Sequence, residues 1–209
     1  MRILFALLVA CVGLRAAERP SQPNVLWITA EDMSPVLGCY GDEFATTPNI
    51  DRLAKESVRY TKAFATSPVC APSRSCFMLG MYQTTTDTHH MRSHRKDNFQ
   101  LPSGVRPLTH RLKDVGYFTA NITHLGKMET GTGKLDLNFV NEGKLYDTAQ
   151  WEDLKAHQPF FAQINLPEAE YDIYDRKSKD KKRVPWVGEE WHPQIATEHN
   201  VTPPPYYPD

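Results

Sequence analysis

The sequence predicts an α/β domain in which helices flank a mainly parallel sheet. Two short, nearly continuous apolar runs at residues 24–30 and 160–166 are typical of strands that are buried in a parallel sheet. Helical patterns lie between them, and alternation of strands with helices over short loops favours this fold class. The 209 residues, 40% hydrophobic and 23% charged, are enough for one domain with a sizeable core.

The first half of the chain is expected to contribute a strand, a helix and a second strand. Residues 24–30 are predicted to be buried on both faces. Thr47 followed by Pro48 is typical of a helix start, and the apolar spacing that follows predicts an amphipathic helix over residues 48–57. Residues 58–65 alternate around two aromatic side chains, and this alternation predicts a strand.

The second half is expected to add two helices and two strands. A cap signal containing proline predicts a helix over residues 72–80, and residues 107–115 form a helical pattern that Gly116 ends. Residues 117–122 are rich in strand formers, as are residues 160–166. The pattern then fades into a proline-rich ending, which indicates the N-terminal part of a longer protein.

The N-terminus is predicted to be an export signal. Arg2 precedes an apolar stretch at residues 3–12 that is too short to span a bilayer as a helix. We therefore interpret residues 1–17 as a signal peptide and expect a secreted or periplasmic protein. Residues 8–11 also resemble a lipobox, which would place a lipid on Cys11, but the short apolar stretch favours simple secretion.

Composition excludes several function classes. The formal net charge of -1, from 24 basic and 25 acidic residues, gives no indication of nucleic-acid binding. A mean hydropathy of -0.52 excludes a multispan membrane protein, and we expect no stable membrane span. Four cysteines are too few for a disulfide-built scaffold. The basic run at residues 176–183 is interpreted as a solvated surface segment, with a polyanion contact as the alternative.

Two acidic side chains, Glu31 and Asp32, follow the first predicted strand directly. Ligands of open parallel sheets gather at the carboxyl ends of the strands. Adjacent carboxylates there suit a hard cation such as Ca²⁺ or Mg²⁺. The alternative interpretation is a solvated acidic loop.

Residues 70–74, with the sequence CAPSR, combine a nucleophile with groups that attract anions. Cys70 is expected immediately before a helix, where the first amides and the helix dipole favour negative charge. Arg74 lies one turn further along, so its guanidinium can return to the same point. A lone cysteine is also compatible with an inert core residue.

The CAPSR stretch resembles the C-x-P-S-R signature of type I sulfatases, which belong to the alkaline-phosphatase-like superfamily. The resemblance is tight over residues 22–93, includes the downstream Gly80, and is looser over residues 107–166. It implies an alkaline-phosphatase-like sulfatase fold that is incomplete at the C-terminus. Residues 18–209 would then be the N-terminal part of a sulfatase catalytic domain.

The resemblance implies hydrolysis of sulfate esters. Cys70 would be oxidised to formylglycine by a formylglycine-generating or other maturation enzyme, and its hydrate would attack sulfur. Glu31 and Asp32, with the modified Cys70, would bind Ca²⁺, with Mg²⁺ as the alternative. Arg74 and Lys134 would stabilise charge in the reaction. The expected substrate is a sulfated small molecule or a sulfated glycan.

Several positions depart from the pattern of this family. Glu31 stands where the family has aspartate, and Leu79 stands where it commonly has threonine or serine. The stretch GKLD at residues 133–136 resembles a G-K-x-H element with aspartate in place of histidine, whereas Gly126 and Lys127 give a competing match. The resemblance implies a substrate-binding histidine directly after the predicted strand at residues 160–166, but residues 165–170 contain none.

The paired His89 and His90 invite a zinc interpretation, but no third ligand stands at convincing spacing. The alternatives are a polar surface loop, or a substrate cleft lined by His90 and Arg92. Glycosylation sequons begin at Asn121 and Asn200. Two other functions stay open: a phosphonate or phosphate ester hydrolase of the same superfamily, and an inactive fragment or binding protein.

Overall fold

The computed structural model describes residues 22–91, 97–129 and 131–166. Its elements in chain order are β1 (Val25–Ala30), η1 (Gly38–Tyr40), α1 (Pro48–Lys55), α2 (Cys70–Leu79), α3 (Leu108–Asp114), β2 (Phe118–Leu125), β3 (Met128–Glu129), β4 (Thr148–Gln150), η2 (Trp151–Lys155) and β5 (Phe160–Leu166). Several predictions concern residues outside this description: the signal peptide with Cys11, Arg92, the basic run at 176–183 and the sequon at Asn200.

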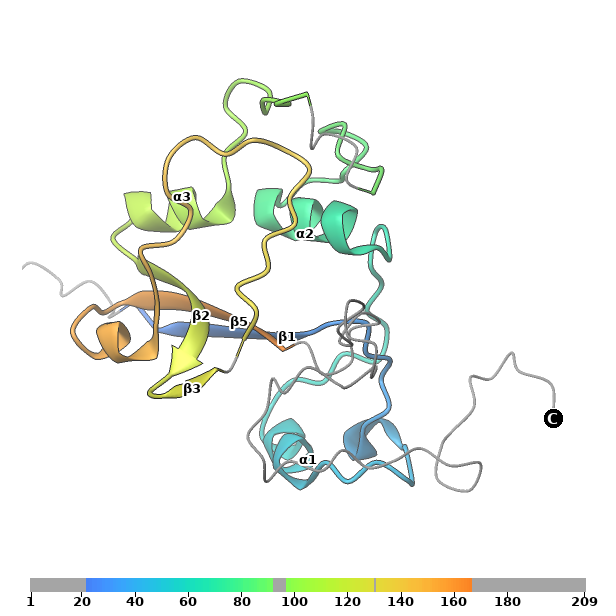
Figure 1. Ribbon diagram of the computed structural model, residues 1–209. Helices are drawn as coiled ribbons and strands as arrows, with labels where there is room; N and C mark the ends of the chain where they lie inside the picture. Colours follow the sequence, from blue (N-terminus) through green and yellow to red (C-terminus); the bar gives the residue numbers. More distant parts are fainter. Residues whose placement is uncertain (1–21, 92–96, 130, 167–209) are drawn as a thin grey trace, which may run out of the picture.

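The sheet is mainly parallel, as predicted. Its strand order is β1-β5-β2-β3, and β4 pairs with β2 on a separate path. β5 lies in the middle and runs parallel to β1 and β2, while the short β3 is antiparallel to β2. α2 and α3 lie together on one side of this sheet (Figure 1). The predicted α/β fold class is therefore confirmed.

An aromatic core joins the sheet to α2. Trp27 of β1 packs edge-on against Phe77 of α2, with 4.8 Å between ring centroids, and against Phe161 of β5 at 6.1 Å. Met78 and Leu79 are buried in the same cluster. Large aromatic side chains of this kind contribute much of the packing energy of a core. The cluster therefore fixes the position of α2 relative to β1 and β5.

The opposite face of the sheet is covered by η2. Leu154 packs against Ala120, Ile122 and Ala162, all of which are at most 2% exposed. These residues come from the central strands β2 and β5, so the cover sits over the middle of the sheet.

β1 is a strand, as predicted, but it is not buried on both faces. Leu26 is 46% exposed and Ile28 is 56% exposed. Both point to the face that η2 covers, and η2 packs on β2 and β5 rather than on β1. A continuous apolar run predicts a strand that can be buried on both faces. Whether it is buried depends on other elements that pack against those faces.

The predicted strand at residues 58–65 is wrong, because this stretch is irregular in the structure. Its aromatic side chains are open to solvent: Tyr60 is 70% exposed and Phe64 is 86% exposed. Alternation alone does not make a strand, since a strand also needs a neighbour to receive its backbone hydrogen bonds. None of the described strands pairs with this stretch.

The predicted helix at residues 48–57 is present as α1, but its apolar side chains are exposed, with Leu53 at 65%. The Thr47 hydroxyl also does not cap α1 as expected. It accepts the Gly38 amide hydrogen at 2.9 Å and donates to Asp51 Oδ1 at 3.0 Å. Thr47 and Asp51 therefore tie α1 to η1.

Among the described residues, no helix is long and apolar enough to cross a bilayer.

Glycines end the two helices that cover the sheet. Gly80 follows α2 with a φ of +64°, and its amide donates to the Cys76 oxygen at 2.8 Å. Gly116 lies just beyond the end of α3 with a φ of +95°, where it was predicted to stop the helix. Glycine adopts a positive φ at lower cost than any other residue, which suits it to both positions.

The Asp147 carboxylate links three elements of the fold. It accepts the amide of Thr119 at 2.8 Å and its hydroxyl at 2.9 Å, and it pairs with Lys113 Nζ at 2.9 Å. Burial raises the pKa of Asp147, but the hydrogen bonds from Lys113 and Thr119 outweigh burial and hold the pKa below its usual 3.8. Asp147 thus stabilises the folded state in its ionised form.

Replacing Asp147 with Asn should lower the free energy of unfolding by about 1–2 kcal/mol near neutral pH, because the Lys113 and Thr119 hydrogen bonds lose a charged acceptor. A depressed folded-state pKa means that this contribution is present above pH 3.8 and is lost as the pH falls through the folded pKa. Denaturant unfolding of both proteins between pH 7 and pH 2 measures the difference.

The matched control is Asp114→Asn. Asp114 pairs with Arg106 at the protein surface, where water screens the interaction, so a clearly smaller change than for Asp147→Asn is expected. A difference for Asp147→Asn that stays constant down to the lowest pH would contradict the account.

Candidate active site

Backbone pairing between β1 and β5 positions the first residues of a cavity at the carboxyl end of β1. The Glu31 amide donates to the Leu166 oxygen at 3.1 Å, which extends the β1–β5 ladder by one residue. This bond turns the Glu31 side chain inward, and the residue is only 7% exposed. Asp32 follows with a φ of +51°, a left-handed conformation that aspartate tolerates better than most residues. Two carboxylates therefore end the strand.

Cys70 approaches the carboxylates from the other side. It is the first residue of α2, whereas the sequence predicted it immediately before the helix. The preceding cap residue, Val69, makes no side-chain hydrogen bond to the helix start. No side-chain cap therefore neutralises the first-turn amides or the positive end of the helix dipole. This end of the helix is where Cys70 lies.

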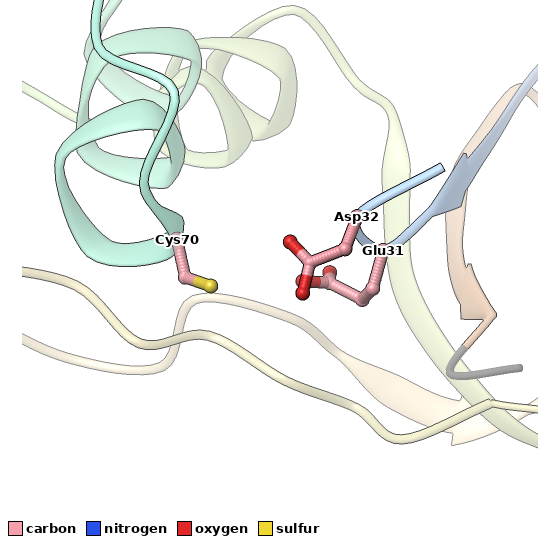
Figure 2. Close-up of side chains that lie close together, drawn as sticks. All are labelled: Glu31, Asp32 and Cys70. Atoms are coloured by element: carbon pink, nitrogen blue, oxygen red, sulfur yellow. The ribbon is translucent and has the colours of Figure 1, made fainter. Parts of the chain in front are cut away.

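The structure brings Glu31, Asp32 and Cys70 together. One ligand atom from each lies within 4.8 Å of the other two. Figure 2 shows the two carboxylates at the end of β1 pointing toward the sulfur at the start of α2. They line a cavity of about 360 Å³ that Arg74 and Ser73 also border.

These three side chains fit a hard divalent cation. Two oxygens bound to one Ca²⁺ at roughly 2.3–2.6 Å lie at most about 5 Å apart, which matches the observed spacing. The two carboxylates are hard ligands, whereas the sulfur of Cys70 is soft. An oxygen in place of that sulfur would complete a set of three oxygen donors. Glu31, Asp32 and Cys70 are the residues that would hold the ion.

Arg74 and Lys134 flank the Glu31 carboxylate. The Arg74 guanidinium, in a residue only 4% exposed, forms an ion pair with Glu31 Oε1. Lys134 Nζ lies 3.2 Å from Glu31 Oε2. A buried carboxylate is costly unless it is paired and hydrogen-bonded, and both of its oxygens are paired here. Together with Asp32, the site beside Cys70 holds two cations and two carboxylates, which balance in formal charge.

Lys134, not Lys127, belongs to this site. The loop that carries Lys134 is held across the strand ends, because the Thr132 amide donates to the Asn165 oxygen at 3.1 Å. The loop needs glycine at position 131, since a Cβ there would lie 2.5 Å from the Ile122 oxygen. Lys127 instead lies exposed in the turn between β2 and β3. The lysine of the aspartate variant of the G-K-x-H element thus reaches Glu31 at the border of the cavity.

The structure does not bring His90 to the cavity that holds Cys70. The His89 and His90 rings contact each other, with centroids 4.1 Å apart, and His89 Nδ1 lies 3.6 Å from Asp87 Oδ1. Within residues 22–91, 97–129 and 131–166, the only group of three or more potential metal-ligating side chains is the one at Cys70. The zinc interpretation of the histidine pair finds no support.

Sequence reasoning missed a set of buried amides beneath the cavity. Asn165 is fully buried and accepts a hydrogen bond from Arg74 Nη1 at 3.0 Å. Asn121 is 7% exposed, and its amide donates to the Gly133 oxygen at 2.9 Å, so the sequon at this position is closed to glycosylation in the fold. The available signal was alternation of polar residues within two strands: Thr119, Asn121 and Thr123 in β2, and Gln163 and Asn165 in β5.

Comparison with known proteins identifies the family. A profile of the sulfatase family matches residues 23–182, which is most of the chain. The chain belongs to the sulfatase family. The resemblance seen at the CAPSR stretch is thereby confirmed, and so is the expected sulfatase fold.

Individual sulfatases are similar to this chain over part of their length. The Ulvan-active sulfatase of Formosa agariphila is 33% identical over 168 residues, which cover 74% of this chain and 26% of that protein. Human iduronate 2-sulfatase is 37% identical over 117 residues, or 54% of this chain and 20% of that protein. The chain thus spans about a quarter of the length of the curated relatives that it matches.

A solved structure shows the same fold. The structure of BT4656 in complex with its substrate D-glucosamine-2-N,6-O-disulfate gives a TM-score of 0.53 at 17% sequence identity. It covers 74% of this chain and 36% of that chain. At this level of identity the similarity concerns the fold alone.

Adding Ca²⁺ or Mg²⁺ should raise the melting temperature of the protein, because an ion that binds only the folded site stabilises it. The substitution Asp32→Asn should remove most of this shift, since it deletes one of two charged ligands. The control Asp114→Asn lies outside the site, in an exposed pair with Arg106, and should leave the shift intact. Equal shifts in both variants would contradict the metal site.

Proposed function

We propose that the complete protein hydrolyses sulfate esters in the cavity lined by Cys70, Arg74 and Glu31. The observation that carries this proposal is the meeting of a potential nucleophile, two carboxylates and a buried arginine at one strand end. A sulfate ester needs an attacking group, a bound cation and positive charge around its oxygens. The cavity offers residues for each of these roles, in a chain of the sulfatase family: Cys70 for the attack, Glu31 and Asp32 to hold the cation, and Arg74 for the positive charge.

Glu31 and Asp32 hold a divalent cation in this proposal, Ca²⁺ in the first place and Mg²⁺ as the alternative. A bound divalent cation supplies Lewis-acid polarisation of the sulfate oxygens. The two carboxylates support the assignment because hard oxygen ligands select hard ions.

Cys70 acts as formylglycine in this proposal, which makes a maturation enzyme a necessary partner. The hydrated aldehyde carries two hydroxyl groups on one carbon. One attacks sulfur in line with the leaving alcohol, and the other then expels sulfate and restores the aldehyde. A serine or an unmodified cysteine lacks the second hydroxyl. The CAPSR sequence at residues 70–74 supports the modification.

Arg74 stabilises the deprotonated hydroxyl of the nucleophile. Its guanidinium is held on one side by Glu31 and on the other by the Lys134 oxygen at 3.0 Å, so it need not reorganise during the reaction. Lys134 offsets the charge that spreads over the sulfuryl oxygens in the transition state. Positive charge placed before the reaction is worth more in a site shielded from water.

The substrate is proposed to be a sulfated glycan or another sulfated small molecule. The names of two relatives refer to ulvan and iduronate, and BT4656 was solved with a sulfated glucosamine. Export through residues 1–17 to a secreted or periplasmic location fits an enzyme that meets such substrates outside the cytoplasm.

Replacing Cys70 with Ala in the complete protein should abolish hydrolysis of an aryl sulfate, because no attacking oxygen remains. The control Cys76→Ala lies in the same helix, is half-buried and accepts a hydrogen bond from Thr66, so its effect should be mild. Turnover is measured side by side on an aryl sulfate and the matching aryl phosphate. Near-normal turnover in the Cys70 variant would contradict the mechanism, and faster phosphate than sulfate turnover would favour the phosphate ester alternative.

The substitution Arg74→Lys should lower kcat/KM for the aryl sulfate by roughly two to three decades, or about 2–4 kcal/mol. Lysine keeps the charge but loses the planar fork that bonds Glu31 and Asn165 at once. Steady-state kinetics at saturating divalent cation measure the effect. A loss of less than about threefold would show that the fork is dispensable.

A further inference from the structure

A chain of buried polar side chains leads from the core of the protein to Arg74. The Tyr146 hydroxyl donates to Gln163 Oε1 at 2.5 Å, and Gln163 Nε2 donates to Asn165 Oδ1 at 3.1 Å. Arg74 Nη1 donates to the same Asn165 oxygen at 3.0 Å. None of these four residues is more than 8% exposed, so each hydrogen bond is shielded from water.

The chemistry of the four groups fixes which of them donates and which accepts in each hydrogen bond. A guanidinium has only donors, so Asn165 must turn its oxygen toward Arg74. Gln163 must then present its NH₂ group to that oxygen, which leaves its own oxygen facing Tyr146. Burial raises the pKa of Tyr146, so its hydroxyl stays protonated and donates.

Strand register places Asn165 at the centre of this network. It pairs with Thr29 across β1 and β5, and the Thr29 hydroxyl donates to Asn165 Oδ1 at 2.8 Å. On the other side, Asn165 Nδ2 donates to Asn121 Oδ1 of β2 at 3.1 Å. Asn165 Oδ1 therefore accepts three hydrogen bonds, and the side chain ties β5 to its two neighbours in the sheet, β1 and β2.

The network also holds the loop that carries Lys134. Asn121 donates to the Gly133 oxygen at 2.9 Å, and Arg74 Nη1 donates to the Lys134 oxygen at 3.0 Å. The two cations beside Glu31 are thus fixed by the same pair of buried asparagines, Asn121 and Asn165.

We propose that Asn165 is a positioning residue for the anion site and that it acts by orienting Arg74. Arg74 borders the cavity, whereas Asn165 lies behind it and has no place in its lining. A guanidinium oriented in advance loses less freedom when an anion binds, which raises affinity. The inference rests on the proposed function, because it treats Arg74 as a group that receives the sulfate.

The test is a double-mutant cycle on binding of inorganic sulfate, measured by calorimetry with the complete protein. Asn165→Ala should weaken binding roughly tenfold in the wild-type background. In an Arg74→Lys background it should change binding by less than about twofold, because the group through which it acts has gone. Equal effects in both backgrounds would overturn the inference.

Two further variants keep the outcome decisive. Tyr146→Phe removes only the hydroxyl at the far end of the chain, so it should weaken sulfate binding roughly threefold, and again only when Arg74 is present. This variant replaces Asn165→Ala in the cycle if Asn165→Ala does not fold.

The matched control is Asn138→Ala, which deletes an equally buried amide that donates to the backbone oxygens of Thr88 and His90. Its effect should be the same in both backgrounds.

Turnover of an aryl sulfate by the unsubstituted protein separates the two proposals. Sulfate binding with a non-additive cycle but no turnover would overturn the proposed function and support the role of Asn165. Turnover with an additive cycle would support the proposed function and overturn the role of Asn165. An unsubstituted protein that neither binds sulfate nor turns over the ester would overturn both.

Discussion

The site depends on one buried carboxylate, that of Glu31, held between Arg74 and Lys134 at the end of β1. Leaving this carboxylate unpaired away from water would cost several kcal/mol, so the fold must deliver both cations. That requirement constrains three segments at once: β1 must end there, α2 must start opposite it, and the loop before β4 must cross the strand ends. The aromatic packing of Trp27 against Phe77 sets the first two relative to each other.

The same arrangement explains how one site accommodates opposite charges. Glu31 and Asp32 attract a cation, whereas Arg74, Lys134 and the start of α2 attract an anion. The two cations and the two carboxylates balance in formal charge, and Glu31 belongs both to the candidate cation ligands and to the ion pairs that hold Arg74 and Lys134. The longer side chain of glutamate, in place of the aspartate usual in the family, reaches both cations from a backbone position fixed by the β1–β5 ladder.

Much of this arrangement was predictable because it depends on local sequence. Apolar runs located β1 and β5, the proline cap located α2, and the acidic strand end and CAPSR stretch supplied the residues that meet at the cavity. The rest depends on tertiary context. Burial of β1 depends on what covers its outer face, residues 58–65 form no strand without a partner, and the role of Asn165 arises from register between strands distant in sequence.

We propose that Cys70 supplies the nucleophile of a sulfatase as formylglycine. Mass measurement of the peptide that spans residues 70–74, isolated from the complete protein made in a host with a maturation enzyme, tests it most directly. We expect the mass that corresponds to an aldehyde in place of the thiol, and we expect that peptide to react with a carbonyl reagent. A peptide that carries only unmodified cysteine, from a preparation that still hydrolyses sulfate esters, would contradict it.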